Sequence, residues 1–205
     1  MNILGFDILS VLIFLPVIGV LLIIMVSKEK PNVVKGVTFI TALVNFLISL
    51  LLFRDFDATT HEFQFTTTVP WIQEYGIYYR LGLDGISLFL VLLTTFLTAL
   101  SIIACWKDIQ EKVKGFMMCL LFLETGVVGV FVSLDLFLFY IFWEVMLIPM
   151  CFLIGVWGAP ARRIYAAVKF FLYTMFGSLL MLVAIVYLYF YNYSVTGVYT
   201  FDIEQ

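Results

Sequence analysis

The stretch LDLFLFYIFWEVMLIPMCFLIGVW, residues 134–157, contains only two charged side chains, Asp135 near its start and Glu144 near its middle. As an α-helix, this stretch would extend over about 36 Å, whereas the hydrocarbon core of a bilayer is about 30 Å thick. The stretch is therefore predicted to be a membrane-spanning helix. It also raises a question, because Glu144 places a carboxylate where a charge is costly.

The whole chain is strongly apolar. Of its 205 residues, 64% are hydrophobic and 12% are charged, whereas a soluble domain is about half apolar and a quarter charged. Several runs are long and uncharged enough to be membrane spans. The sequence therefore predicts an all-α integral membrane protein with a single membrane domain over residues 1–205. Its six expected helices lie near residues 3–26, 33–53, 83–106, 115–132, 134–157 and 164–191.

One connection is long enough to have structure of its own. In HEFQFTTTVPWIQEYGIYYRLGL, residues 61–83, two β-branched and aromatic runs flank a turn around residues 74–76, which is the pattern of a β-hairpin. We expect a short hairpin between the second and third helices. A lone hairpin is marginally stable, so it should pack against the ends of these helices or against a neighbouring subunit.

Lysine and arginine are distributed unevenly between the connections. The first, third and fifth connections contain Lys28, Lys30, Lys35, Lys107, Lys112, Lys114, Arg162 and Arg163, whereas the other side has Arg54 and Arg80. The positive-inside rule predicts that the basic connections face the cytoplasm and that both termini, with the hairpin, face outward. We expect the first helix to be retained rather than cleaved, because nothing basic precedes it and its apolar region is too long for a signal peptide.

Few residues suit covalent or metal chemistry. Cys105, Cys119 and Cys151 lie within predicted helices without the spacing of a metal or redox motif, so packing is the preferred interpretation. His61 stands alone in a loop and is expected to be solvated. We predict no metal site, no cofactor bound by this chain and no nucleic-acid partner.

Two carboxylates, Glu124 and Glu144, are predicted to lie inside the membrane. The fourth and fifth helices are separated by a turn near Ser133 and should be antiparallel neighbours. Glu124 lies 9 residues before Ser133 and Glu144 lies 11 after it, so both are about 13 to 16 Å from the turn, near the bilayer midplane. Membrane-embedded acids often mark proton paths. If the two were close, they could share a proton, but their spacing does not define the rotation of either helix.

Two further residues could modify Glu144. Pro149 removes the hydrogen bond to the carbonyl of Val145, and the resulting kink either admits water beside Glu144 or only bends the helix for packing. Lys169 lies near the cytoplasmic end of the sixth helix, where it either extends to the interface or points inward to a carboxylate.

Several of the acids also have structural interpretations. Instead of carrying a proton, Glu144 could form a hydrogen bond to Tyr140 or to Trp143. Asp7, Asp84 and Asp135 lie at helix starts, where a carboxylate accepts hydrogen bonds from free amides. We therefore expect these three to be N-caps.

Residues 123–158, LETGVVGVFVSLDLFLFYIFWEVMLIPMCFLIGVWG, resemble the antiporter-like membrane subunit M, or chain 4, of respiratory NADH:quinone oxidoreductase, complex I. LGLDGISLFLVLLTTFLT at 81–98 and AAVKFFLYTMFGSLLMLVAI at 166–185 carry the same resemblance. It implies a multi-pass subunit of a proton-pumping membrane arm in a bacterial inner membrane. Other membrane-arm subunits would be partners, and NADH, FMN, iron–sulfur clusters and quinone would be bound in partner subunits.

The resemblance also implies roles for single residues. Glu144, in the FWE motif, matches the key proton-carrying glutamate, and Glu124 fits the family pattern with a secondary role. Members of the family have about fourteen helices in inverted repeats, with a modulating lysine on a broken helix. That lysine and the second repeat have no counterpart among the six helices here, and Lys169 does not replace it. We expect either the N-terminal part of a longer protein or a chain that does not pump alone.

Three functional classes follow. The first is a proton-translocating complex I subunit, which the DGISLFL and FWEVMLIP motifs favour. The second is a subunit of a cation/proton antiporter or of a membrane-bound hydrogenase, which would share the acid and the fold. The third is a truncated scaffold that docks to neighbours and moves no ions.

Overall fold

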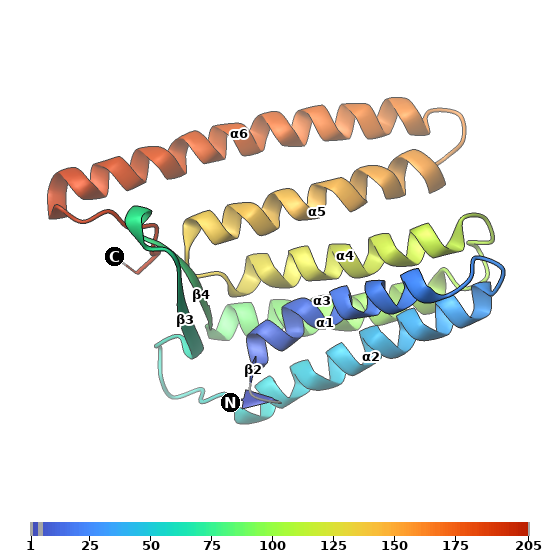
Figure 1. The fold of residues 1–205 in the computed structure, drawn as a ribbon, viewed down its shortest axis with the longest axis horizontal. Coiled ribbons are helices and arrows are strands. Elements are labelled where there is room, and N and C mark those ends of the chain that lie inside the picture. Colours follow the sequence, from blue (N-terminus) through green and yellow to red (C-terminus); the bar gives the residue numbers. More distant parts are fainter. Residues whose placement is uncertain (1, 4–5, 205) are drawn as a thin grey trace.

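A computed structural model describes residues 2–3 and 6–204, which form six long helices and a β-hairpin (Figure 1). All six helices are long and apolar enough to cross a membrane, so the predicted multi-pass fold is confirmed. The helices are α1 (Ile8–Met25), α2 (Pro31–Asp55), α3 (Gly85–Ala104), α4 (Val113–Val132), α5 (Leu136–Trp157) and α6 (Arg163–Thr196).

Several predicted helix ends were wrong by a few residues. The helix expected at 3–26 begins at Ile8, because Asp7 caps it, and residues 4–5 of that range lie outside the described residues. The helix expected from residue 83 begins at Gly85, because Leu83 still pairs within the hairpin. The last helix does not end at residue 191. It continues through a polar segment to Thr196, where Gly197 adopts a φ of +75° that favours glycine at a helix end.

Five further helix ends differ by two residues each, and one of them is the end of the third helix, at Ala104 rather than residue 106. The second helix begins at Pro31 rather than residue 33 and ends at Asp55 rather than residue 53, because a proline is well suited to the first turn. The fourth begins at Val113 rather than residue 115, and the fifth begins at Leu136 rather than residue 134. In the fifth helix the cause is the N-cap Asp135, which fixes where the helical amides begin.

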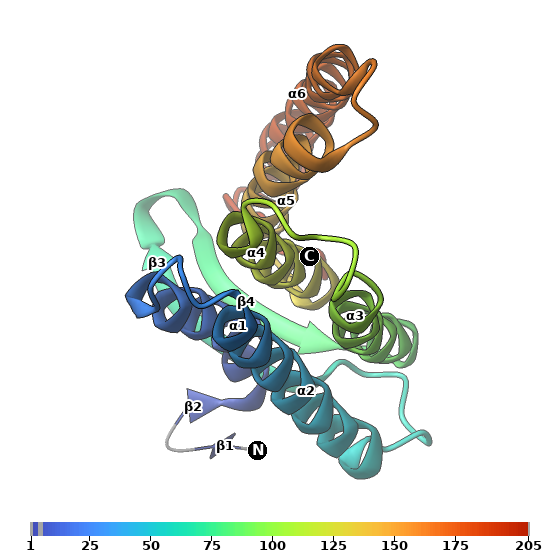
Figure 2. The same ribbon diagram turned by 90° about the vertical axis from the view of Figure 1, so that its right-hand side faces the viewer.

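The helices lie side by side with the α1–α2, α3–α4 and α5–α6 connections at one end of the molecule (Figure 1). This is the end that carries the predicted basic connections, and we call it the basic end. The hairpin and both termini lie at the opposite end, the hairpin end. Helix α4 is central and packs against α1, α2, α3 and α5, whereas α6 packs mainly against α5. Viewed along the bundle, α5 and α6 extend away from the other four helices (Figure 2).

Two glycines allow α4 and α5 to approach closely. A Cβ atom on Gly126 would lie 2.8 Å from the Cβ of Met146, and one on Gly129 would lie 2.4 Å from the ring of Phe142. Small residues permit such contacts between membrane helices, where dispersion rather than water exclusion drives association. The α4–α5 spacing, and thus the position of Glu144, depends on these glycines.

The predicted hairpin is present and packs against the helix ends. Strands β3 (Gln64–Ile72) and β4 (Ile77–Leu83) pair antiparallel around a short 3-10 turn, and Gly76 has a φ of +65°. The amide of Leu134 donates to the carbonyl of Arg80 at 3.0 Å, so β4 is tied to the α4–α5 turn. The guanidinium of Arg80 also pairs with Asp202 and Glu204, which holds the C-terminal segment there. A smaller pair, β1 (Asn2–Ile3) and β2 (Phe6–Asp7), precedes α1.

The three aspartates predicted to be N-caps all have this role. Asp7 accepts from the amide of Ser10 at 2.9 Å, and Asp84 accepts from the amide of Ser87 at 2.7 Å. Asp135 accepts from the first-turn amides of α5 at 2.9 and 3.0 Å. It also accepts from the amide of Tyr78 at 3.1 Å, so the same carboxylate joins a helix start to the hairpin.

Replacing Asp135 by alanine should therefore cost more than replacing Asp84. The first change removes three backbone hydrogen bonds from a side chain that is 1% exposed, and we expect a loss of about 2–3 kcal/mol, against about 1 kcal/mol for Asp84→Ala. Unfolding in mild detergent, followed by circular dichroism, measures both. Equal losses would show that the bond to Tyr78 contributes nothing.

Candidate functional site

Glu124 lies near the middle of α4 and points toward α2. Its side chain is 1% exposed, and its Oε1 accepts a hydrogen bond of 2.8 Å from Nδ2 of Asn45, which is completely buried. Neither Oε2 of Glu124 nor Oδ1 of Asn45 has a hydrogen-bond partner. Buried polar atoms are nearly always satisfied in proteins, so these two oxygens mark an unusual site.

Asn45 belongs to a polar face of α2 that the sequence analysis missed. Within the helix, the buried polar side chains recur every three or four residues, at Thr38, Thr41, Asn45 and Ser49. This is the period of one helix face, and it could have been recognised in the sequence. All three hydroxyl groups in this set donate to carbonyls of their own helix, and Ser49 also bonds to Thr95 of α3 at 3.0 Å. Asn45 is the member that meets a carboxylate.

Glu144 lies on α5 at the boundary with α6. It is half-buried, and its Oε1 is buried without a hydrogen-bond partner. The phenol of Tyr140, one turn earlier, interacts with Glu144 and with Ser178 of α6. Trp143 instead packs against Phe139, with ring centroids 5.9 Å apart. Of the two structural partners considered for Glu144, Tyr140 lies near it, but the hydrogen bond that would satisfy its buried Oε1 is not found in the described part of the chain.

Glu124 and Glu144 are not brought together. Glu124 lies at the α2–α4 interface, whereas Glu144 lies at the α5–α6 interface, and no hydrogen bond between them is found in this described part of the chain. Each lies in the central part of its helix, and the depth of each in a membrane stays a prediction. Direct sharing of one proton would require a bridging group, such as water.

Lys169 and Pro149 occupy different surroundings. The Lys169 side chain is exposed, and its Nζ lies 5.8 Å from the centre of the Tyr165 ring. Lys169 lies before Ser178 on α6, about 13 Å away along the helix axis, and it forms no ion pair with either glutamate. Pro149 is buried inside α5, one turn beyond Val145, whose carbonyl loses its helical donor.

Two groups in the hairpin and cap region titrate away from their ordinary ranges. Burial raises the pKa of the Tyr79 phenol to about 12, so it remains protonated and forms a hydrogen bond of 2.8 Å with Ser10 of α1. Burial also raises the pKa of Asp135, although its backbone hydrogen bonds and Arg80 act in the opposite direction. Both groups form hydrogen bonds between the hairpin and the helices.

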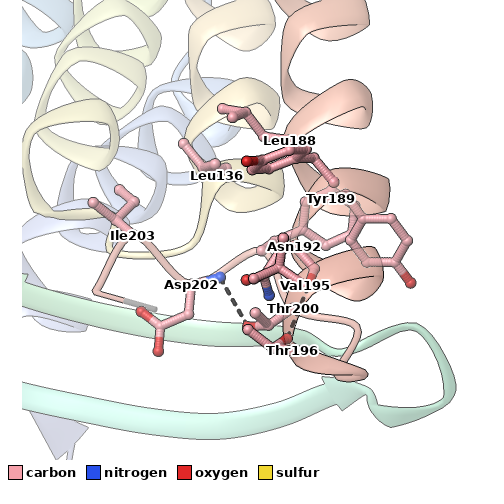
Figure 3. A pocket seen from close by; sticks show the side chains of 11 residues that line it. Leu136, Leu188, Tyr189, Asn192, Val195, Thr196, Thr200, Asp202 and Ile203 are labelled. Carbon is pink, nitrogen blue, oxygen red and sulfur yellow. Dashed lines mark hydrogen bonds between the residues drawn. The ribbon is translucent and has the colours of Figure 1, made fainter.

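A cavity of about 530 Å³ lies at the hairpin end, between the last turns of α6 and the C-terminal segment (Figure 3). Its wall is mostly apolar and aromatic, and Asp202 is its acidic member. Leu136, the first residue of α5, also lines it, so Glu144 is about 12 Å further along that helix. The cavity is therefore separate from both membrane carboxylates.

Comparisons with known proteins agree with this architecture. Residues 133–203 match a family model described as NADH:quinone oxidoreductase/Mrp antiporter, TM. NADH-ubiquinone oxidoreductase chain 4 of Marchantia polymorpha is 43% identical over 182 residues, which are 89% of this chain and 37% of the relative. NADH-quinone oxidoreductase subunit M of Rickettsia typhi is 40% identical over 188 residues, 89% of this chain and 38% of the relative.

Solved structures show the same fold. A chain in respiratory complex I from Thermus thermophilus with bound NADH superposes with a TM-score of 0.78 at 26% identity, covering 96% of this chain and 38% of that chain. A chain of the Mrp complex from a Dietzia species gives a TM-score of 0.75 at 18% identity, covering 97% of this chain and 20% of that chain. The second likeness concerns the fold alone.

The six apolar helices, together with the family match over residues 133–203, define an antiporter-like, multi-pass membrane protein. Within that class, the chain belongs to the family of NADH:quinone oxidoreductase subunit M, also called chain 4. The chain spans about two fifths of the length of the curated relatives it matches.

Proposed function

We propose that the chain is part of a proton-translocating membrane subunit of NADH:quinone oxidoreductase, in which Glu144 carries the proton. The observation that supports this most is a half-buried carboxylate with an unpartnered oxygen at mid-depth of α5, in a chain of this family. Acids inside membrane helices commonly mark proton paths, where a carboxyl group can bind a proton and pass it to water.

The neighbours of Glu144 suggest a local route. Tyr140 lies beside both Glu144 and Ser178, so its hydroxyl can donate to one and accept from the other. Pro149 leaves the carbonyl of Val145 free beside Glu144, and a water molecule bound there would extend the route. Glu124 is a second proton-holding site on the other side of α4. Lys169 has no role in this route.

Electron transfer is assigned to partners. NADH, FMN, iron–sulfur clusters and quinone would be bound in other subunits, and this chain would have no catalytic activity alone. Other membrane-arm subunits are the proposed neighbours. The proposed orientation places the basic end in the cytoplasm of a bacterial cell, with the N-terminus outside the inner membrane.

Isolation from native membranes tests the assignment to a complex. With an affinity tag on this chain, we expect NADH-oxidising subunits to be recovered together with it after solubilisation in mild detergent, because a membrane arm and its redox arm form one assembly. NADH:quinone oxidoreductase activity and mass spectrometry of the eluate measure this. Recovery with antiporter subunits only would instead support the antiporter alternative. An eluate that transfers electrons but takes up no protons after reconstitution into sealed vesicles would support the scaffold.

A further inference from the structure

A carboxylic acid and a carboxamide can form a closed ring of two hydrogen bonds. The amide N–H donates to the carbonyl oxygen of the acid, and the acid O–H donates to the amide oxygen. Asn45 and Glu124 show the first of these bonds, from Nδ2 to Oε1 at 2.8 Å. The other polar atoms of this pair, Oδ1 of Asn45 and Oε2 of Glu124, are among the buried atoms without a partner, and they are the two that the second bond would join.

A proton on Oε2 is what the second bond requires. Without it, Oδ1 and Oε2 are both acceptors and neither has a donor, which is unfavourable for buried polar atoms. With it, Oε2 becomes a donor and Oδ1 its acceptor. We propose that Asn45 and Glu124 form an acid–amide pair that stores one proton on Glu124, with Asn45 as the positioning residue that governs its release.

The charges around the pair support a neutral acid. Among the elements packed on α4, helices α1 and α3 contain no charged residue. On α2, Lys35 lies about 15 Å from Asn45 along the helix and donates to the carbonyl of Trp106 at 2.6 Å, while Arg54 near the other end pairs with Asp55.

The remaining charged groups are also engaged elsewhere. Arg80 of β4 pairs with the C-terminal segment. Lys114 of α4 donates to the carbonyls of Ile24 and Val26 at the basic end. Glu144 of α5 faces α6. No ion pair compensates a Glu124 anion in the described part of the chain, so its charged form has no electrostatic support.

The pair joins two helices and is therefore sensitive to their movement. Asn45 is on α2 and Glu124 is on α4, so a shift between these helices lengthens both bonds of the ring and weakens its hold on the proton. Proton release from Glu124 would then accompany movement of α2 against α4. This inference rests on the proposed function, which supplies a proton to be moved.

Infrared spectroscopy of the chain in its native complex and membrane tests the pair. We expect a carbonyl band of a protonated carboxyl group at neutral pH, assigned to Glu124 because it is lost in Glu124→Gln. In Asn45→Ala the band should shift to higher wavenumber, because the carbonyl oxygen no longer accepts a hydrogen bond. Ser49→Ala is the matched control, since Ser49 is equally buried on the same face of α2 and bonds to Thr95. It should leave the band in place.

Two results would overturn the pair. One is the absence of a Glu124 band at neutral pH, and the other is a band that Asn45→Ala and Ser49→Ala affect alike. If Asn45→Ala fails to assemble, Asn45→Ser keeps a small polar side chain, removes the amide and should give the same shift. Glu124→Gln should assemble normally, because its amide can still donate to Oδ1 of Asn45.

NADH-driven proton uptake by Glu144→Gln membranes separates this inference from the proposed function. If Glu144→Gln membranes take up protons normally and the infrared band shifts in Asn45→Ala, Glu144 does not carry the proton but the pair still holds one. If Glu144→Gln membranes lose uptake and the band does not shift in Asn45→Ala, Glu144 carries the proton and the pair does not exist.

Discussion

Replacing Glu144 by glutamine should abolish proton translocation while leaving the fold intact. Glutamine has the size of the protonated acid but cannot release a proton, so a route that depends on Glu144 is interrupted. A side chain that transfers protons in a reaction commonly contributes about 100-fold or more to its rate, and we expect at least that loss in proton uptake. Membrane vesicles supplied with NADH and a quinone, together with a pH-sensitive dye, measure uptake and oxidation in the same sample.

Two further variants control this experiment. Glu144→Asp retains the carboxyl group on a shorter side chain and should keep part of the uptake. Tyr140→Phe removes the hydroxyl beside Glu144 without charge or much volume, and should slow uptake less than Glu144→Gln. Normal coupled uptake in Glu144→Gln would show that this carboxylate is a structural group, and the scaffold interpretation would then be preferred.

Introducing valine at Gly129 should destabilise the bundle strongly, although the change does not touch a polar group. Even a Cβ atom would lie 2.4 Å from the Phe142 ring, well inside van der Waals contact, and Phe142 is buried between α4 and α5. The helices must therefore separate. Overpacking of this kind costs about 1–3 kcal/mol, and the branched side chain places the loss at the upper end. Thermal unfolding in detergent measures it.

The chain offers a matched control and a rescue for this prediction. A Cβ atom on Gly177 of α6 meets nothing within 4 Å, so Gly177→Val should leave the stability nearly unchanged. Phe142→Ala should be destabilising alone, but in combination with Gly129→Val it provides room for the new side chain. We expect the double variant to be more stable than the sum of the single losses indicates. Strict additivity would contradict a direct clash between these two residues.

The elements of this fold follow largely from local sequence signals. Long apolar runs predict the spans, and a turn at residues 74–76 between aromatic runs predicts the hairpin. The three capping aspartates were also identified correctly, because a cap involves amides within the same few residues. Ends were less accurate where a tertiary contact extends an element, as with Leu83, which pairs in β4.

For the candidate site as well, some features could be predicted from the sequence and others could not. The positions of Glu124 and Glu144 along their helices depend only on where each helix begins and ends, so the sequence alone was sufficient to place both in the central part of a helix. The direction in which each carboxylate points depends on the rotation of its helix, and this is decided by packing among segments far apart in the chain. Glu124 meets Asn45, 79 residues away, and no local pattern contains that pairing.

By itself, then, the sequence determined that this is a multi-pass membrane protein with two acids in the central parts of its helices. Composition and helical rise act residue by residue, so they need no knowledge of neighbours. Only the tertiary structure decided that the acids lie on opposite sides of the α4–α5 pair, one against a carboxamide and one against a phenol. The physical reason is that helix rotation is set by close contacts such as those at Gly126 and Gly129, which exist only once the helices have packed.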